Sequence, residues 1–427
     1  MTLKKTLVSL FILTSLTSVA QNNEVTPFTY NKSTNQYTGL TPIVNALKDQ
    51  TIVALGEGTH GTKEFNDLRV ELIKDLVTKH NFRIITFENA YGDTYMLNKD
   101  INSNGGLGQA MKENLVSVWQ TKEIKNLFLW IREYNKKTKD KVILTGIDTN
   151  FLTNSVSILQ GEKDLTRNKT YYENCLKLSD AAKVIDFSWS KSNDSTFTPD
   201  YDNLIKVGTE AYQLTKEMTP KYTKQLSTDA QIALYNLELG FRMLYEVGQR
   251  NGDYTRDYAM AETAMRTQSL LDKKMIIIAH NGHIGLTQSL LDPMGEYIKK
   301  QYGTMFYSLG TFTANGTYSA MTDNIDVKIS KYTSYELPQV LDNSLEQQME
   351  QYPEKNYFVD FRNVPTSVFD TPKKMNWIGY KRMTQEEQTK YMTIENVKLR
   401  EHFDGFIFMN TTSASEHFYL LKKILWE

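Results

Sequence analysis

A carboxylate and an imidazole stand three residues apart in the segment GEGTHG, directly after an apolar run of the chain. Glu57 and His60 are flanked by glycines, and the run 51–55 that precedes them is typical of a buried strand. A neutral imidazole acts as a general base near neutral pH, and a neighbouring carboxylate fixes its tautomer and stabilises the imidazolium that forms. This pattern predicts acid–base chemistry at the end of the strand.

Polar side chains also follow three later apolar runs. They are Glu88, Asp148, His280 and His283. The chain has only six histidines, and three of them, counting His60, follow predicted strands. In open α/β sheets, ligands bind outside the carboxyl ends of the strands, so we expect these residues to surround one pocket. A carboxylate after a strand is also often a helix N-cap, and this interpretation stays open for Asp148.

The elements that must position these residues indicate an α/β fold. The predicted strands are 51–55, 83–87, 141–145 and 275–279, then 304–312, 357–361 and 405–409, and the predicted helices of the first half are 43–47, 63–79 and 122–136. Alternation of strand and helix predicts a central, mostly parallel sheet flanked by helices. We assign 40–149 and 273–427 to this catalytic core. Residues 150–272 show helical periodicity, and we expect a large helical insertion that forms a cap over the C-terminal strand ends.

The first twenty residues have the pattern of a secretory signal peptide. Lys4 and Lys5 precede a short apolar stretch, and small residues precede a cleavage point after Ala20. The stretch is too short to span a membrane, so we expect no membrane span after cleavage and a protein exported to the periplasm or secreted. Residues 21–39 are polar and turn-rich, as in an N-terminal arm. The single cysteine, Cys175, excludes an intramolecular disulfide.

Charge and motif content narrow the chemistry. With 49 basic and 50 acidic residues, the chain has no bias toward nucleic acid. No G-x-S-x-G nucleophile motif occurs, so direct activation of water by a base needs fewer assumptions than a covalent intermediate. Arg69, about two and a half turns beyond His60 on the next predicted helix, can point back toward the site. We expect no cofactor, although the H-x-x-H pair His280 and His283 leaves a catalytic metal as an alternative.

At this point the residues resemble a known family. GEGTHGTKEF is similar to the G-E-x-T-H-G motif of the erythromycin esterase family. Arg69 matches the arginine nine residues after the motif histidine, Glu88 matches a glutamate that follows a strand, and AHNGHI matches the family's His-Asn-x-His segment. Weaker similarities occur in VWQTKEIKNLFLWIREYN, in TGIDTN and in RDYAMAE, and the resemblance covers roughly residues 40 to 425.

The resemblance implies a metal-independent hydrolase of esters, typically the lactone of a macrolide antibiotic, with water as co-substrate. The family's base corresponds to His60, and Glu57 and Glu88 correspond to glutamates that orient or assist it. His280, His283 and Arg69 correspond to groups that position the substrate or stabilise charge. The residues expected to bind the substrate are Thr59, Asn281, Asp148 and Arg256.

The substrate itself is not fixed by these motifs. Family members that confer resistance work inside the cell, whereas this chain has the pattern of an exported protein. An exported hydrolase of another ester or amide, including a metal-dependent peptidase, and a non-catalytic ligand-binding relative therefore stay open. Aromatic residues of the insertion can line a wide apolar cleft or simply pack its helices. They are Tyr171, Tyr172, Phe187, Trp189, Tyr201, Tyr212 and Tyr254.

Overall fold

A nine-stranded mixed sheet forms the centre of the protein. The computed structural model describes residues 24–31, 33–34, 36–103, 105–288, 292–322, 327–328 and 330–418, so the predicted signal peptide lies outside the described residues. The strand order is β1-β10-β13-β8-β4-β7-β5-β6, with β9 paired to β8. The strands are β1 (Thr26–Pro27), β4 (Ile52–Leu55), β5 (Phe82–Ala90), β6 (Ile143–Asp148), β7 (Lys274–Ile278), β8 (Phe306–Met321), β9 (Tyr332–Glu336), β10 (Asn356–Asp360) and β13 (Gly405–Thr412).

The middle of this sheet is parallel and its edge additions are antiparallel. Strands β13, β8, β4, β7, β5 and β6 all run in the same direction. Strands β1, β10 and β9 pair antiparallel to their neighbours. All four residues of β4 are buried, as expected for a strand with helices on both faces. The prediction of a mostly parallel α/β sheet is thus confirmed.

Helices cover both faces of the sheet. The helices outside the insertion are α1 (Thr41–Leu47), α2 (Lys63–His80), α3 (Tyr91–Ile101), α4 (Leu107–Asn114), α5 (Lys122–Lys137), α10 (Arg256–Leu271), α11 (Asn281–Ile284), α12 (Met294–Tyr302), α13 (Leu345–Met349), α14 (Gln385–Tyr391) and α15 (Leu399–His402). Helix α5 illustrates why such a segment becomes helical. The Thr121 side chain caps its first turn, and its apolar residues recur on one buried face.

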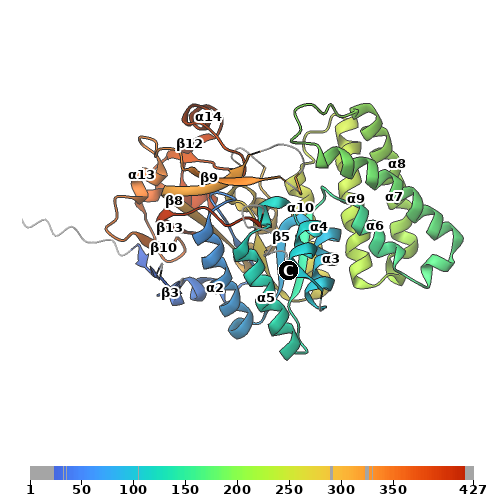
Figure 1. Cartoon of the computed structure of the whole chain (residues 1–427), viewed down its shortest axis with the longest axis horizontal. Coiled ribbons are helices and arrows are strands. Elements are labelled where there is room, and N and C mark those ends of the chain that lie inside the picture. The colour runs from blue at the N-terminus through green and yellow to red at the C-terminus, as the bar shows by residue number, and fades with distance from the viewer. Residues whose placement is uncertain are drawn as a thin grey trace, which may run out of the picture.

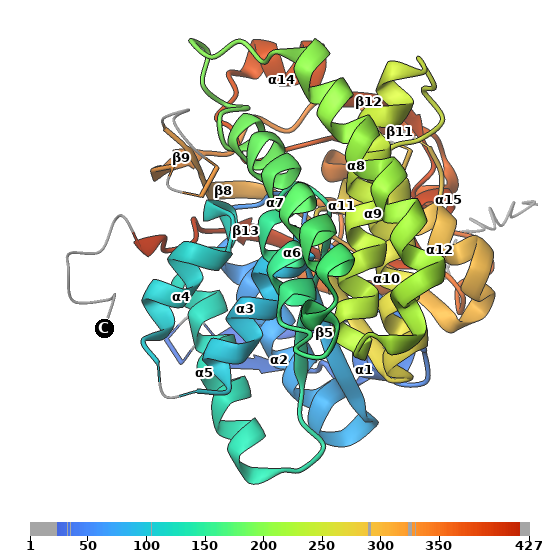
Figure 2. The same cartoon turned by 90° about the vertical axis from the view of Figure 1, so that its right-hand side faces the viewer.

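The predicted insertion is mainly helical, with loops between its helices, the longest of them at residues 191–200. Its helices α6 (Thr153–Gln160), α7 (Lys169–Ser190), α8 (Tyr201–Tyr222) and α9 (Thr228–Gly248) share a core of their own. They lie together beside the α/β core, where α6 packs on α3 and α9 on α10 (Figures 1 and 2). Helix α10 then returns the chain to β7.

The sequence patterns missed part of the C-terminal half. Strand β8 does not stop near residue 312 but continues to Met321, beyond the edge of the parallel sheet, where β9 folds back on it. A small hairpin of β11 (Lys373–Asn376) and β12 (Thr393–Val397) also stands apart from the main sheet, as does the arm hairpin of β2 (Thr29–Asn31) and β3 (Gln36–Thr38). Within the described part of the chain, every helix is too short or too polar to cross a membrane.

Candidate active site

The loop after β4 holds His60 against a buried carboxylate. Nδ1 of His60 lies 2.7 Å from Oε1 of Glu57, which is completely buried. The other oxygen of Glu57 accepts a hydrogen bond from Arg69 at 2.5 Å, and Arg69 also donates to Asn66. A carboxylate facing Nδ1 favours the tautomer with the proton on that nitrogen. Nε2 of His60 has no hydrogen-bond partner among the described residues and is the nitrogen left to act as a base.

A β-bulge aims Glu88 toward the same region. The pairing of β5 with β6 shifts register between Phe87 and Ala90, and bulges of this kind redirect a side chain. Gly146 permits the distortion, because a Cβ there would lie only 2.2 Å from the backbone oxygen of Asn89. The backbone oxygen of Glu88 accepts the indole N–H of Trp119 at 3.0 Å. The Glu88 side chain therefore extends from the carboxyl edge of the sheet, where its carboxylate contacts Arg256 and His283.

His283 is held between two carboxylates. Its Nδ1 lies 2.9 Å from Oδ2 of Asp257, and its Nε2 lies 3.1 Å from Oε1 of Glu88. Burial disfavours the charged ring, but the two carboxylates outweigh it and raise the pKa of His283 to about 10. Burial would likewise raise the pKa of Glu88, yet the charges of His283 and Arg256 hold it well below its usual range. At neutral pH, His283 is an imidazolium and Glu88 a carboxylate.

Arg256 completes this charged cluster. Its Nη2 donates to Asp148 at 2.5 Å and to Glu88 at 3.0 Å, and its Nε donates to Asp148 at 3.1 Å. Burial acts against the charged guanidinium, but the Asp148 and Glu88 carboxylates raise the pKa of Arg256. The remaining nitrogen, Nη1, lies 3.4 Å from Nε2 of His283. That ring nitrogen carries a proton, so it offers Nη1 no lone pair, and Nη1 can donate to a ligand.

Asp148 is thus a partner of Arg256 and not a helix N-cap. The helix after β6 begins at Thr153, and Leu152 occupies its N-cap position. Asp148 also accepts the backbone N–H of Thr149 at 2.7 Å. The alternative interpretation of Asp148 as an N-cap is therefore wrong.

His280 is neutral and fully bonded. Its Nδ1 accepts the backbone N–H of Gly282 at 3.1 Å, so its Nε2 carries the proton and donates to the backbone oxygen of Ile378 at 3.1 Å. Burial, with the nearby charges of His60 and His283, lowers the pKa of His280 to about 3. Its ring centre lies 4.9 Å from that of His60. His280 thus packs beside the base and anchors the loop that contains Ile378.

A cavity of about 570 Å³ opens onto these groups. Its polar and charged lining from the predicted site is His60, Glu88, Asp148, Arg256, His280 and His283. The other lining residues are mainly apolar or aromatic: Val116, Ser117, Val118, Asn150, Phe151, Trp189, Ser192, Asn193, Met321, Val327, Tyr332, Trp377, Gly379, Tyr380, Tyr391 and Met392. A large, mostly apolar cavity with a few converging polar groups is typical of a small-molecule site.

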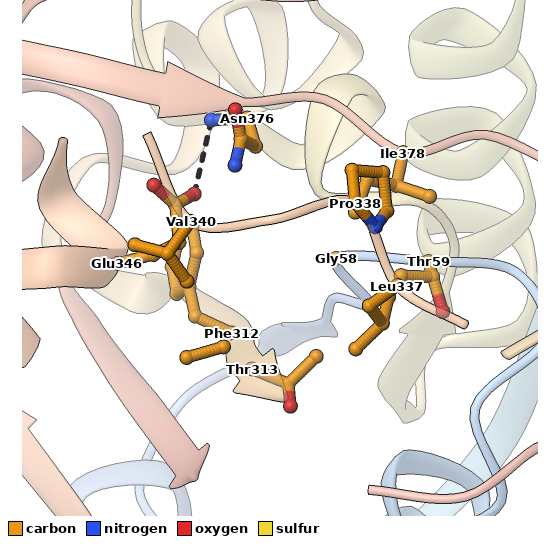
Figure 3. Close-up of a pocket in the computed structure, with 11 residues that line it drawn as sticks. Gly58, Thr59, Phe312, Thr313, Leu337, Pro338, Val340, Glu346, Asn376 and Ile378 are labelled. Atoms are coloured by element: carbon orange, nitrogen blue, oxygen red, sulfur yellow. Dashed lines mark hydrogen bonds between the residues drawn. The ribbon is translucent and has the colours of Figure 1, made fainter. Parts of the chain in front are cut away.

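Four predicted site residues do not line this cavity. Glu57 and Arg69 lie behind His60, as described above. Asn281 binds the backbone of Thr311 through both ends of its amide, at 2.8 and 3.1 Å. Thr59 contacts Thr62 and lines a separate pocket of about 20 Å³ beside α13, shown in Figure 3. These four side chains are therefore not part of the wall of the large cavity.

The insertion contributes little of its aromatic surface to the cavity. Of the aromatic residues singled out in the insertion, Trp189 alone is among the cavity's lining residues. Tyr171 and Tyr212 are buried in the insertion's own core, and Tyr172, Phe187 and Tyr201 are exposed. Asp257, in contrast, is a site residue that the sequence did not reveal. It follows Arg256 in the first turn of α10, and only the fold brings it to His283.

Among the described residues, no group of three or more His, Cys, Asp or Glu side chains is placed to hold a metal ion. Both nitrogens of His280 are hydrogen-bonded to the backbone, and both nitrogens of His283 face carboxylates. The H-x-x-H pair in this arrangement therefore has no free lone pair to offer.

The sequence matches the erythromycin esterase family over residues 77–412. The chain belongs to the erythromycin esterase family. It is 28% identical to erythromycin esterase type II of Escherichia coli, over 92% of this chain and 97% of that protein. It is also 28% identical to the putative hydrolase YbfO of Bacillus subtilis, over 86% of this chain and 85% of that protein. This membership makes the chain a relative of hydrolases and confirms the resemblance seen in its motifs.

Solved structures agree with the fold of this erythromycin esterase family member. A Bacillus cereus protein of known crystal structure superposes with a TM-score of 0.76 at 22% identity, covering 92% of this chain and 96% of that one. A mutant of the erythromycin esterase EreC in its open conformation superposes with a TM-score of 0.63 at 19% identity, covering 87% of this chain and 93% of that one. At these identities the likeness concerns the fold.

Proposed function

We propose that the protein is an esterase that opens the lactone of a macrolide antibiotic with water activated by His60. The observation that carries the proposal is the orientation of His60. Its Nδ1 contacts Glu57, and its Nε2 is therefore the nitrogen that is free to act on a ligand in the cavity that His60 lines. Membership of the erythromycin esterase family supports the reaction class, and the name of the Escherichia coli relative supports the substrate.

The base is His60 because neither of the other two histidines of the site has a free lone pair that could accept a proton. His283 is protonated at neutral pH, and both nitrogens of His280 are hydrogen-bonded to the backbone. Nε2 of His60 takes a proton from water as the water oxygen attacks the lactone carbonyl. The imidazolium formed is stabilised by Glu57 and returns the proton to the ring oxygen as the C–O bond breaks. A carboxylic acid and an alcohol result, with one water consumed.

Arg256 is the group best placed to stabilise the oxyanion. Its Nη1 lies 3.4 Å from Nε2 of His283, which is protonated at neutral pH and cannot accept a hydrogen bond, and its side chain lines the cavity. Asp148 and Glu88 fix the other two nitrogens, so the donor is oriented before substrate binds, which is what makes such donors effective. Arg69 cannot take this role, because it is buried behind Glu57.

The cavity walls favour a bulky, largely apolar ester. The charged lining side chains are those of the catalytic cluster, and each carboxylate among them is paired with a cation. The aromatic residues Trp189, Trp377 and Tyr380 add wide apolar surface. We propose that the insertion caps the cavity, and that the chain is exported through its N-terminal signal peptide.

The test is exposure of the purified protein to a panel of macrolides, followed by mass spectrometry. The proposal expects a product heavier by one water from at least one macrolide, and no product with His60→Asn. Circular dichroism checks that this variant is folded. If macrolides stay intact while simple esters or amides are cleaved in a His60-dependent way, the hydrolase proposal stands with another substrate. If a macrolide binds tightly and emerges intact, the chain is a binding relative.

A further inference from the structure

Gly61, the residue after the base, is held in place through its backbone oxygen. The backbone oxygen of Gly61 accepts the N–H groups of Ser319 and Ser415, each at 2.9 Å, and the Ser319 hydroxyl lies 3.3 Å from it. A Cβ at Gly61 would lie 1.9 Å from the backbone oxygen of Ser319, so only glycine fits this close approach. Strand β8 and the segment around Ser415 therefore meet directly beside His60.

Residues 413–418, here called the C-terminal segment, run along the catalytic loop. Ala414 pairs with Thr62 in an antiparallel bridge, and the backbone oxygen of Ser413 accepts the N–H of Lys63 at 2.8 Å. The carboxylate of Glu64 in turn accepts the backbone N–H of Ser413 at 2.7 Å. The segment thus covers the start of α2, the helix that follows the base.

The C-terminal segment is also linked, through other side chains, to Glu57, the carboxylate that contacts Nδ1 of His60. The Ser415 hydroxyl accepts Nδ2 of Asn66 at 3.1 Å, and Oδ1 of Asn66 accepts a hydrogen bond from Arg69. Arg69 then holds Glu57, which holds Nδ1 of His60. One chain of contacts therefore joins the C-terminal segment to both the backbone and the carboxylate partner of the base.

His417 connects the C-terminal segment to Ser319 of β8 and to Tyr332 of β9. Its Nε2 lies 2.9 Å from Oγ of Ser319, and its ring stacks on Tyr332 with a 4.0 Å centroid separation and a 6° interplanar angle. Burial lowers the pKa of His417 to about 3, so the ring is neutral. Ser319 and His417 have the composition of a nucleophile–base pair, but their exposed fractions are 0% and 1%, and neither is among the cavity's lining residues. Their contacts point to positioning.

We infer that Ser319 and His417 are positioning residues that hold the His60 loop in its reactive geometry. The inference rests on the proposed function for its catalytic readout. Three glycines, Gly56, Gly58 and Gly61, make the loop intrinsically free to move, so its geometry must be imposed by outside contacts. Misplacement of a reacting group by about 1 Å costs on the order of a hundredfold in rate. The family match ends at residue 412, before the C-terminal segment begins.

The test compares His417→Phe with His402→Phe. The first variant keeps a ring to stack on Tyr332 but cannot bond Ser319, and the second is a matched control because His402 is also a buried histidine in the C-terminal half. For His417→Phe we expect a fall in kcat of tenfold or more, as an order of magnitude, with KM within about twofold of wild type. Ser319→Ala, which keeps the backbone N–H to Gly61, should lower kcat in the same direction. His402→Phe should leave kcat near the wild-type value.

A second readout does not depend on esterase activity. Nitrogen-15 NMR of the histidine side chains reports the tautomer of His60, and we expect the Nδ1–H form in the wild type and a mixture of tautomers in His417→Phe. An unchanged tautomer together with an unchanged kcat would overturn the inference. A fall in kcat matched by His402→Phe would also overturn it, because the loss would then be general destabilisation. If the wild type cleaves no ester, the proposed function fails, but the NMR comparison still decides the positioning role.

Discussion

Replacement of Asp257 by Asn probes the charge state of His283 most sharply. Asp257 is one of two carboxylates that flank the buried imidazolium, and the other is Glu88. An asparagine keeps the size of the side chain and an oxygen for the backbone N–H of Met294, which Asp257 accepts at 3.0 Å. The substitution therefore removes charge with little change in packing.

The expected magnitude follows from the pKa of His283, which rises from 6.5 to about 10 in the folded protein. One opposite charge at contact distance shifts a pKa by about 1–3 units. We therefore expect the pKa of His283 in Asp257→Asn to fall by about 1–3 units, a loss of about 1.5–4 kcal/mol of stability at pH 7 or below, at 1.36 kcal/mol per unit.

The sign of the pH dependence is fixed by the direction of the shift. Because the folded pKa is raised, the stabilisation is fully present below pH 6.5 and is lost as the pH rises toward about 10. The wild type should lose stability across this window by up to about 1.4 kcal/mol per pH unit from this group. In Asp257→Asn this stabilisation should be lost completely at a lower pH than in the wild type.

The assay is an NMR titration of the histidine side chains between pH 6 and 10.5, as approximate limits around the shifted pKa, with urea unfolding at several pH values. Asp164→Asn is the control, since that side chain is 96% exposed and should change neither quantity. If His283 of the wild type titrates near its ordinary value, the assignment of an imidazolium between two carboxylates is refuted.

Three further predictions concern catalysis. His60→Asn should lower kcat by roughly 10²–10⁴-fold, the usual contribution of a general base, while the circular dichroism spectrum stays unchanged. Arg256→Lys, which keeps the charge but loses the guanidinium geometry, should lower kcat by about 10²–10³-fold with a smaller change in KM, measured by steady-state kinetics. Dialysis against EDTA should leave ester hydrolysis intact, and a loss that zinc restores would favour the metal-dependent alternative.

The motif residues could be predicted from the sequence because each follows a strongly apolar run. Parallel strands present their carboxyl ends at one edge, so Glu88, Asp148, His280 and His283 were expected to meet, and the structure brings them to one cavity. Their individual roles were not readable from the order of residues. His280 and His283 are three residues apart, yet one is neutral and the other protonated, because the carboxylates of Asp257 and Glu88 contact the ring nitrogens of His283, whereas the ring nitrogens of His280 bond to the backbone.

Contacts across long sequence separations account for what the sequence did not reveal. Asp257 reaches His283 only because α10, which packs against β6 and α12, brings its first turn to the segment after β7, and no local pattern encodes that distance. His417 lies in a segment without periodicity, and its partner Ser319 is part of a β8 extension that the apolar pattern did not predict. Arg69 was expected to point back toward the site and does so, but burial places it behind Glu57.

The most direct test of the account is hydrolysis of a macrolide in water enriched in heavy oxygen, with mass spectrometry of the opened product. If His60 activates water, the wild type yields a ring-opened acid that carries one heavy oxygen in its new carboxyl group, and His60→Asn yields none. Recovery of intact macrolide from the wild type, or equal labelling by His60→Asn, would contradict the central claim.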